Sequence, residues 1–79
     1  MTLYEISFDE QLDDGDFLQA TPLMVLANGD ASEAIAKARR SRLGKIERWT
    51  DESEGKKYKA KVTGFALRGV KVIADVDIS

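Results

Sequence analysis

Cysteine and histidine are both absent from this sequence of 79 residues. Without cysteine there can be no disulfide, thiolate zinc site, iron–sulfur cluster or cysteine nucleophile. Without histidine the chain also lacks the commonest general base, the commonest transition-metal ligand and the usual activator of a nucleophilic serine. The remaining side-chain chemistry is that of carboxylates and lysines, so we expect a protein that is not an enzyme and needs no cofactor.

Long apolar runs are scarce as well. The longest, residues 23–27, is far too short to cross a bilayer, and the N-terminus lacks the basic and apolar regions of a signal peptide. We therefore expect a cytoplasmic protein with no membrane partner. An apolar fraction of 43% and a charged fraction of 33% are typical of a globular chain. Residues 1–79 are expected to form a single compact domain with a thin core.

Hydrophobic periodicity predicts five strands and one helix. Strands are expected at residues 3–8, 17–27, 45–50, 57–62 and 70–78, where apolar side chains alternate with polar ones or run together. Pro22 implies an edge or an interruption in the second strand, because proline cannot donate to a ladder. Gly64 indicates a bulge, and Arg68-Gly69 indicates a turn.

The helix has the clearest boundaries in the chain. Asp30 can cap its N-terminus, with Glu33 three residues later to complete a capping box, and Gly44 suits its C-terminal end. Its apolar stripe is mostly alanine: Ala31, Ala34, Ile35 and Ala38. These elements predict an α+β fold, a mostly antiparallel β-sheet with one helix packed on one face, in the order β-β-α-β-β-β.

Charge is distributed unevenly along the chain, although the net charge is only −2. Residues 1–36 contain eight acids and no base, whereas residues 37–71 contain all twelve bases and four acids. Such asymmetry indicates interaction surfaces if the two halves stay apart in the fold. If the halves interleave, the charges largely cancel.

The N-terminal acids are concentrated after the first strand, at Asp9, Glu10, Asp13, Asp14 and Asp16. Carboxylates at this density can bind calcium, but the spacing of an EF-hand and its bidentate glutamate are missing. A hydrolase would need two acids facing each other across a cleft, which a hairpin tip does not offer. We expect either a solvated turn or a surface that docks a basic partner protein, with no metal and no catalytic residue.

The bases form a second candidate surface. Four lie on the helix and three alternate along a strand: Lys37, Arg39, Arg40 and Arg42, then Lys57, Lys59 and Lys61. Together they could bind the phosphates of a nucleic acid, bind an acidic protein, or remain solvated. The acidic pI of about 5.0 weighs against an electrostatically driven nucleic-acid binder.

Trp49 is a candidate hot spot for a partner. If Ile46 faces the core, alternation places Trp49 on the opposite side of its strand. An exposed tryptophan commonly dominates the binding energy of an interface. A local bulge would instead turn it inward.

No motif in the chain identifies a family. The predicted layout of strands around one capped helix resembles, in general shape, the small proteins with which phages inhibit bacterial defence systems, anti-CRISPR proteins among them. The resemblance implies an inhibitor that occludes a basic, nucleic-acid-handling partner. The residues favour a small non-enzymatic protein-binding module acting through charged surface, with a small nucleic-acid-binding protein as the alternative. The last strand, residues 70–78, could also pair with a second copy to form a homodimer.

Overall fold

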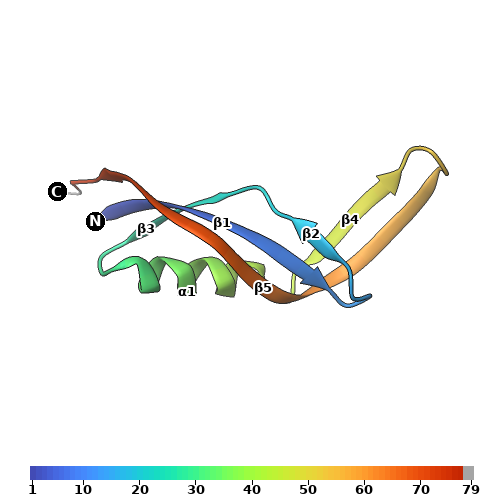
Figure 1. Ribbon diagram of the computed structural model, residues 1–79, viewed down its shortest axis with the longest axis horizontal. Helices are drawn as coiled ribbons and strands as arrows, with labels where there is room; N and C mark the ends of the chain where they lie inside the picture. Colours follow the sequence, from blue (N-terminus) through green and yellow to red (C-terminus); the bar gives the residue numbers. More distant parts are fainter. Residues whose placement is uncertain (78–79) are drawn as a thin grey trace.

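The computed structural model describes residues 1–77 as an antiparallel sheet with one helix packed on one face (Figure 1). The elements are β1 (Thr2–Leu12), β2 (Phe17–Gln19), β3 (Leu23–Ala27), α1 (Ala31–Arg42), β4 (Ile46–Asp51) and β5 (Lys56–Asp75). The strand order across the sheet is β2-β1-β5-β4, and β3 also pairs with β1. The predicted α+β class is confirmed, but the order along the chain is β-β-β-α-β-β instead of β-β-α-β-β-β.

The difference in order has two causes, one on each side of the helix. Around Pro22 the strand predicted at residues 17–27 is interrupted, so β2 and β3 pair with different halves of β1. After the helix, the last two predicted strands are one continuous strand, β5. The turn predicted at Arg68-Gly69 is instead a bulge in β5, with Arg68 as the extra residue. Residue 78 of the predicted final strand lies outside the described residues.

Two further bulges occur in β5 where it pairs with β1, at Thr63 and Ile73. The first adjoins Gly64, where the sequence predicts a bulge. Bulges increase the local twist of a strand. In accordance with this, β5 first pairs with β4 in the hairpin, and its later part then coils along β1 (Figure 1).

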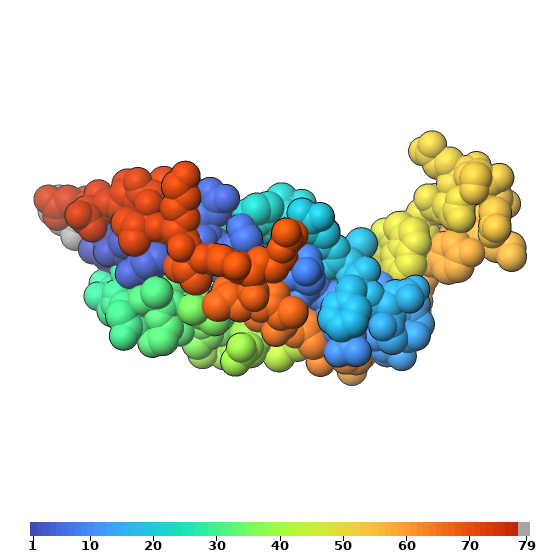
Figure 2. All heavy atoms as spheres, in the orientation of Figure 1, coloured from blue at the N-terminus to red at the C-terminus, as the bar shows by residue number. Residues whose placement is uncertain are grey.

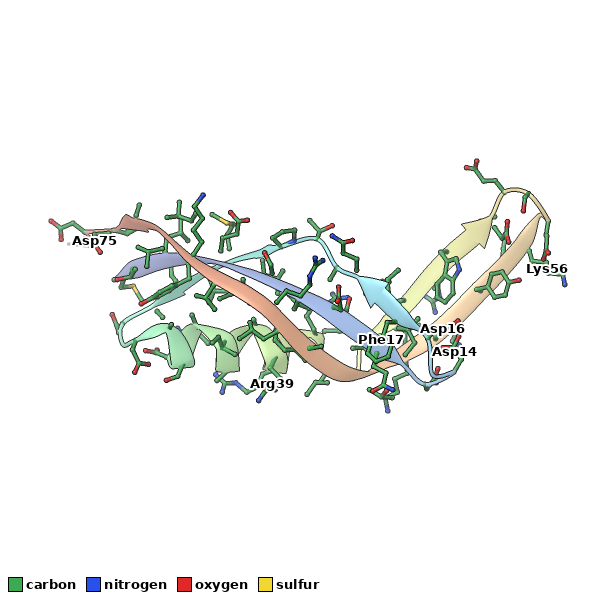
Figure 3. All side chains as sticks on the ribbon, viewed as in Figure 1. Asp14, Asp16, Phe17, Arg39, Lys56 and Asp75 are labelled. Carbon is green, nitrogen blue, oxygen red and sulfur yellow. The ribbon has the colours of Figure 1, made fainter. Side chains whose placement is uncertain are left out.

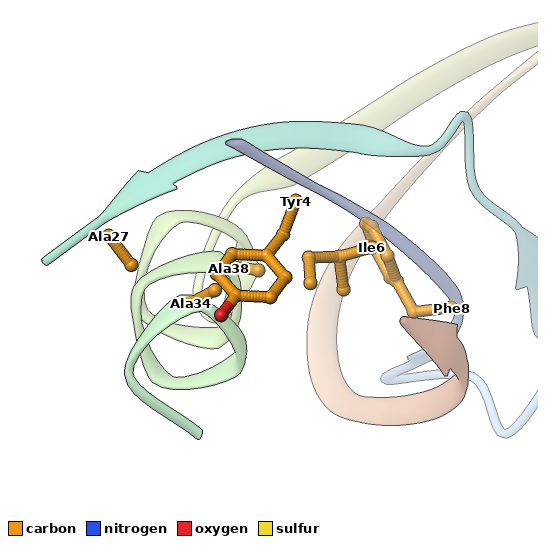
Figure 4. Close-up of a cluster of buried hydrophobic side chains, with 6 residues drawn as sticks. All are labelled: Tyr4, Ile6, Phe8, Ala27, Ala34 and Ala38. Atoms are coloured by element: carbon orange, nitrogen blue, oxygen red, sulfur yellow. The ribbon is translucent and has the colours of Figure 1, made fainter. Parts of the chain in front are cut away.

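The main core lies between the helix and one face of the sheet. Alternate residues of β1, namely Tyr4, Ile6 and Phe8, point toward α1 and are at most 7% exposed (Figure 4). The helix meets them with Ala34 and Ala38, whose small side chains allow it to lie close to the sheet. Full burial of a large apolar side chain contributes about 1.5–3 kcal/mol, so this short row of residues dominates the stability of the fold.

The predicted caps of α1 are both present. The carboxylate of Asp30 accepts hydrogen bonds from the backbone N–H and the hydroxyl of Ser32, at 3.1 and 2.5 Å. These bonds, the hydroxyl's first, lower the pKa of Asp30 below its ordinary value of 3.8. Glu33 accepts from the N–H of Gly29 at 2.5 Å, one residue earlier than a standard capping box. Gly44 follows the helix with a φ of 85°, as predicted.

The molecule is elongated because the hairpin of β4 and the start of β5 extends away from the core (Figure 1, Figure 2). It measures 50 × 20 × 20 Å, and its radius of gyration of 14.9 Å exceeds the value of about 12 Å for a compact chain of this length. A second small cluster, formed by Leu12, Ala60 and Val62, is buried at the base of the hairpin. Within residues 1–77, no helix is long and apolar enough to span a membrane.

Candidate functional site

The five acids predicted to share one loop have different environments in the structure. Asp9 and Glu10 belong to β1, and only Asp13, Asp14 and Asp16 follow that strand. Asp9 forms an ion pair with an arginine of β5, at 3.6 Å. Glu10 is 1% exposed, so it is unable to contribute to a binding surface.

Glu10 is buried because it continues the alternation of Ile6 and Phe8 on the helix side of β1. Its carboxylate accepts two hydrogen bonds from Arg42 at the end of α1, from Nε at 3.2 Å and from Nη2 at 3.1 Å. The same Nη2 also bonds to the carboxylate of Glu47 in β4. One guanidinium therefore links β1, the helix and the hairpin. Sequence reasoning missed this link, although an acid in phase with an apolar alternation was a usable signal.

A hollow of about 330 Å³ lies beside these two carboxylates. The rest of its lining includes the apolar residues Phe8, Leu18 and Leu23. Because both carboxylates are bound to one guanidinium, they do not form the opposed pair that a glycosidase uses. Among residues 1–77, no cluster of three acids is arranged to hold a metal ion.

Residues 13–16, which we call the acidic turn, keep three acids that form no ion pair within the described part of the chain. A hydrogen bond within the turn orders it: the backbone N–H of Asp16 donates to the side-chain carboxylate of Asp14 at 2.9 Å. Gly15 adopts a φ of 92°, which glycine reaches without strain. The N–H of Asp13 donates to the carbonyl of Lys61 at 2.9 Å. This bond attaches the turn to the base of the β4–β5 hairpin.

The basic residues of the helix do not form one free surface. Arg42 is engaged in the interior link, and Lys37 pairs with a glutamate one turn earlier in the helix, at 3.5 Å. Arg39 lies over the ring of Phe65, with its guanidinium carbon 5.6 Å from the ring centroid. Arg40 is exposed. The predicted continuous surface from helix to strand is therefore broken up on the helix side.

The basic residues of the strand, in contrast, share one side of the β4–β5 hairpin. The antiparallel ladder pairs Arg48 with Lys59 and Ile46 with Lys61. Directly paired residues point to the same side, and alternate residues of a strand do too. One side, which we call the basic face, therefore carries Arg48, Lys57, Lys59 and Lys61. None of these four forms an ion pair with another residue in the range 1–77.

The opposite side of the hairpin carries Trp49 and Tyr58, which we call the aromatic pair. They are direct partners in the ladder, and their rings stack with centroids 5.5 Å apart and an interplanar angle of 14°. Their exposed fractions are 37% and 38%. Trp49 is therefore exposed and not turned inward, but the assumption behind that prediction is wrong. Ile46 is 44% exposed, and Trp49 lies on the same side of the hairpin as the buried Ala60. The pair and the flanking Arg48, Lys57 and Lys59 line a hollow of about 310 Å³.

Acidic groups stand at both ends of the basic face. At the tip, the carboxylate of Asp51 accepts hydrogen bonds from the hydroxyl of Ser53 at 2.7 Å and from its N–H at 3.0 Å. These bonds, the hydroxyl's first, lower the pKa of Asp51. At the base lies the acidic turn. Figure 3 shows Asp14 and Asp16 beside the start of the hairpin and Lys56 close to its tip.

Comparison of the chain with protein-family models, curated proteins and solved structures finds no match. Its function is therefore inferred from the chemistry of these surfaces.

Proposed function

We propose that this chain is a small non-enzymatic protein-binding module. Its contact region is the distal surface, which we define as both sides of the projecting hairpin, the aromatic pair on one side and the basic face on the other, together with the acidic turn. The observation that carries the proposal is the aromatic pair: Trp49 and Tyr58 are more than one-third exposed at the projecting end of the molecule. Tryptophan, tyrosine and arginine are the residue types that most often dominate binding energy at interfaces. All three types line the hollow at the hairpin.

The charges of the basic face and the acidic turn support a protein partner with both signs on its surface. A positive strip of four side chains is bounded by acids at the tip and at the base of the hairpin. The acids of the acidic turn repel one another in the free protein. A basic region on the partner would relieve that repulsion and speed the encounter. A protein that handles nucleic acid has such a basic region, and this chain would inhibit it by occlusion.

Nucleic acid is the second candidate, and the basic face is the observation in its favour. Alternate strand residues such as Lys57, Lys59 and Lys61 follow one another at about 6.6 Å. A two-stranded ribbon fits the major groove of DNA, and exposed aromatic rings can stack on unpaired bases. However, a long polyanion passing along this face would meet the acids at either end. The net charge of −2 also opposes its approach.

Charge reversal on the distal surface tests the proposal. One double variant, Asp13→Lys with Asp14→Lys, reverses the charge of the acidic turn. The other, Lys57→Glu with Lys59→Glu, reverses the charge of the basic face. A partner is captured from host lysate at low and high salt and identified by mass spectrometry. Its affinity for each variant is then measured by titration with both proteins purified. Each reversed pair, and Trp49→Ala alone, should weaken binding at least about tenfold.

The matched control is Arg39→Glu with Arg40→Glu, on the helix and outside the distal surface, which should leave the affinity unchanged. Labelled single-stranded and double-stranded oligonucleotides are titrated in parallel. If nucleic acid is the ligand, reversing Lys57 and Lys59 abolishes oligonucleotide binding, whereas reversing Asp13 and Asp14 strengthens it. That pattern would overturn the protein-binding proposal. If only the variant Arg39→Glu with Arg40→Glu loses partner binding, the contact surface lies on the helix and not on the distal surface.

A further inference from the structure

The sheet face opposite α1 is covered by no other element among residues 1–77 (Figure 1). Since Tyr4 and Ile6 point toward the helix, Leu3 and Glu5 point away from it. Their ladder partners point the same way. At the end of the sheet that holds the chain termini, this outer face therefore consists of Leu3, Glu5, Met24, Leu26, Lys71 and Ala74. We call these six residues the outer patch.

The outer patch differs from the rest of the same sheet face. Met24 and Leu26 are 53% and 37% exposed, although both are large and apolar. Farther along, β1 presents Ser7, Asp9 and Gln11 on this face, which is the usual composition of an antiparallel sheet face in contact with water. Leucine and methionine side chains thus gather at one end of this face, where a contact would bury them, whereas the other end exposes the single large apolar residue Phe17, the partner of Gln11.

We propose that the outer patch binds a second copy of this chain, face to face, in a two-fold symmetric dimer. The argument is charge complementarity. Glu5 and Lys71 are direct neighbours across β1 and β5, and neither forms an ion pair with another described residue. A two-fold axis that runs along the strands, midway between β1 and β5, places Glu5 of one copy over Lys71 of the second copy, and the reverse.

The same axis also satisfies the apolar residues. It places Leu3 over Ala74 of the second copy, because these two are likewise partners across β1 and β5. Met24 and Leu26, on the next strand, then cover the outer side of β5 of the second copy. Two sheets can pack in this aligned way with their strands within about 30° of each other. The patch is therefore complementary to itself in both charge and apolar character.

Pairing through the edge of β5, which the sequence suggests, is less favourable than this face. Between residues 63 and 75 that edge has no strand beside it within the described chain. It is interrupted by three bulges, at Thr63, Arg68 and Ile73, and it carries the charge of Lys71. Bulges and lysines are the features by which natural sheet edges avoid pairing.

Sedimentation equilibrium of the full chain, from micromolar to millimolar concentration, tests the proposal. The wild-type chain should show a reversible monomer–dimer equilibrium. Glu5→Lys and Lys71→Glu should each raise the dissociation constant at least about tenfold, because each introduces two like-charge contacts per dimer. The double variant Glu5→Lys with Lys71→Glu should restore the wild-type constant. Met24→Lys should weaken the dimer whatever the charges at positions 5 and 71, in the wild-type chain and in the double variant alike.

Phe17→Lys is the matched control, since Phe17 is 66% exposed but lies on β2, at the other end of the sheet. It should leave the dimer unchanged, as should Trp49→Ala, so this proposal stands or falls separately from the proposed function. Circular dichroism checks that every variant is folded. A chain that stays monomeric at all concentrations would overturn the proposal. So would a dimer that Glu5→Lys and Met24→Lys leave intact.

Discussion

The two ends of this molecule use their large side chains in opposite ways. In the body, formed by β1, β3, α1 and the later part of β5, Ile6 and Phe8 are 0% and 1% exposed. In the β4–β5 hairpin, Trp49 and Tyr58 are more than one-third exposed, and only Ala60 is buried. The alternating pattern of residues is the same in both. What differs is the presence of a helix to cover the apolar side, so the body buries its large side chains and the hairpin leaves them exposed.

The largest effect should come from the body. Phe8→Ala removes a fully buried ring that stacks on Phe65 with centroids 4.5 Å apart. We expect a loss of about 3–5 kcal/mol in the free energy of unfolding, because a thin core has little means to refill the cavity. Urea denaturation of the variant and the wild type measures this loss. If Tyr58→Ala in the hairpin cost as much, the contrast between the two ends would be wrong.

The next effect concerns Arg42, which joins the two ends. Arg42→Ala leaves the buried carboxylate of Glu10 without its only charged partner among residues 1–77, so we expect a loss of about 3 kcal/mol. The double variant Glu10→Leu with Arg42→Leu should recover most of this loss, because an apolar pair needs no partner in the interior. The same urea measurement compares the three proteins. Equal losses in the single and double variants would show that Arg42 acts through its packing and not through its charge.

These residues also show how far the sequence can predict the structure. The strand that contains Ile6 and the helix with its cap at Asp30 follow from periodicity and local turn chemistry. The exposure of Trp49 does not, because Trp49 shares its side of the strand with the buried Ala60 and is exposed only where the hairpin extends beyond the core. The arrangement after Gly64 does not, because the residues of a bulge and of a turn are alike and only the pairing with β1 distinguishes them. The phase of Glu10 with Ile6 and Phe8 was a usable signal for its burial, but its partner Arg42, 32 residues away in the sequence, is known only from the fold.

A smaller effect is expected at the helix cap, and it depends on pH. The pKa of Asp30 is lowered, chiefly by the hydroxyl of Ser32, so the folded state keeps this carboxylate ionised at a lower pH than the unfolded chain does. The stabilisation is therefore present above pH 3.8 and is lost as the pH falls below that value. Asp30→Ala should lower the melting temperature at neutral pH by less than Phe8→Ala does. The difference from the wild type should shrink in acid, and a constant difference would contradict the role of the charge.

The smallest effect on global stability should come from Trp49→Ala, and it distinguishes a contact surface from a second core. The ring lies on a two-stranded hairpin whose other neighbours are mostly exposed, so we expect a change below about 0.5 kcal/mol in global unfolding. Locally the aromatic stack contributes about 0.5–1.5 kcal/mol. Native-state hydrogen exchange should therefore show the amides of β4 exchanging up to about tenfold faster in the variant, while those of β1 are unchanged. Faster exchange in both β4 and β1 would mean that the hairpin and the body unfold as one unit, and that the role of Trp49 is to stabilise the fold. Exchange confined to β4, together with loss of partner binding, would assign the tryptophan to recognition, because the fold then survives without the ring and the complex does not.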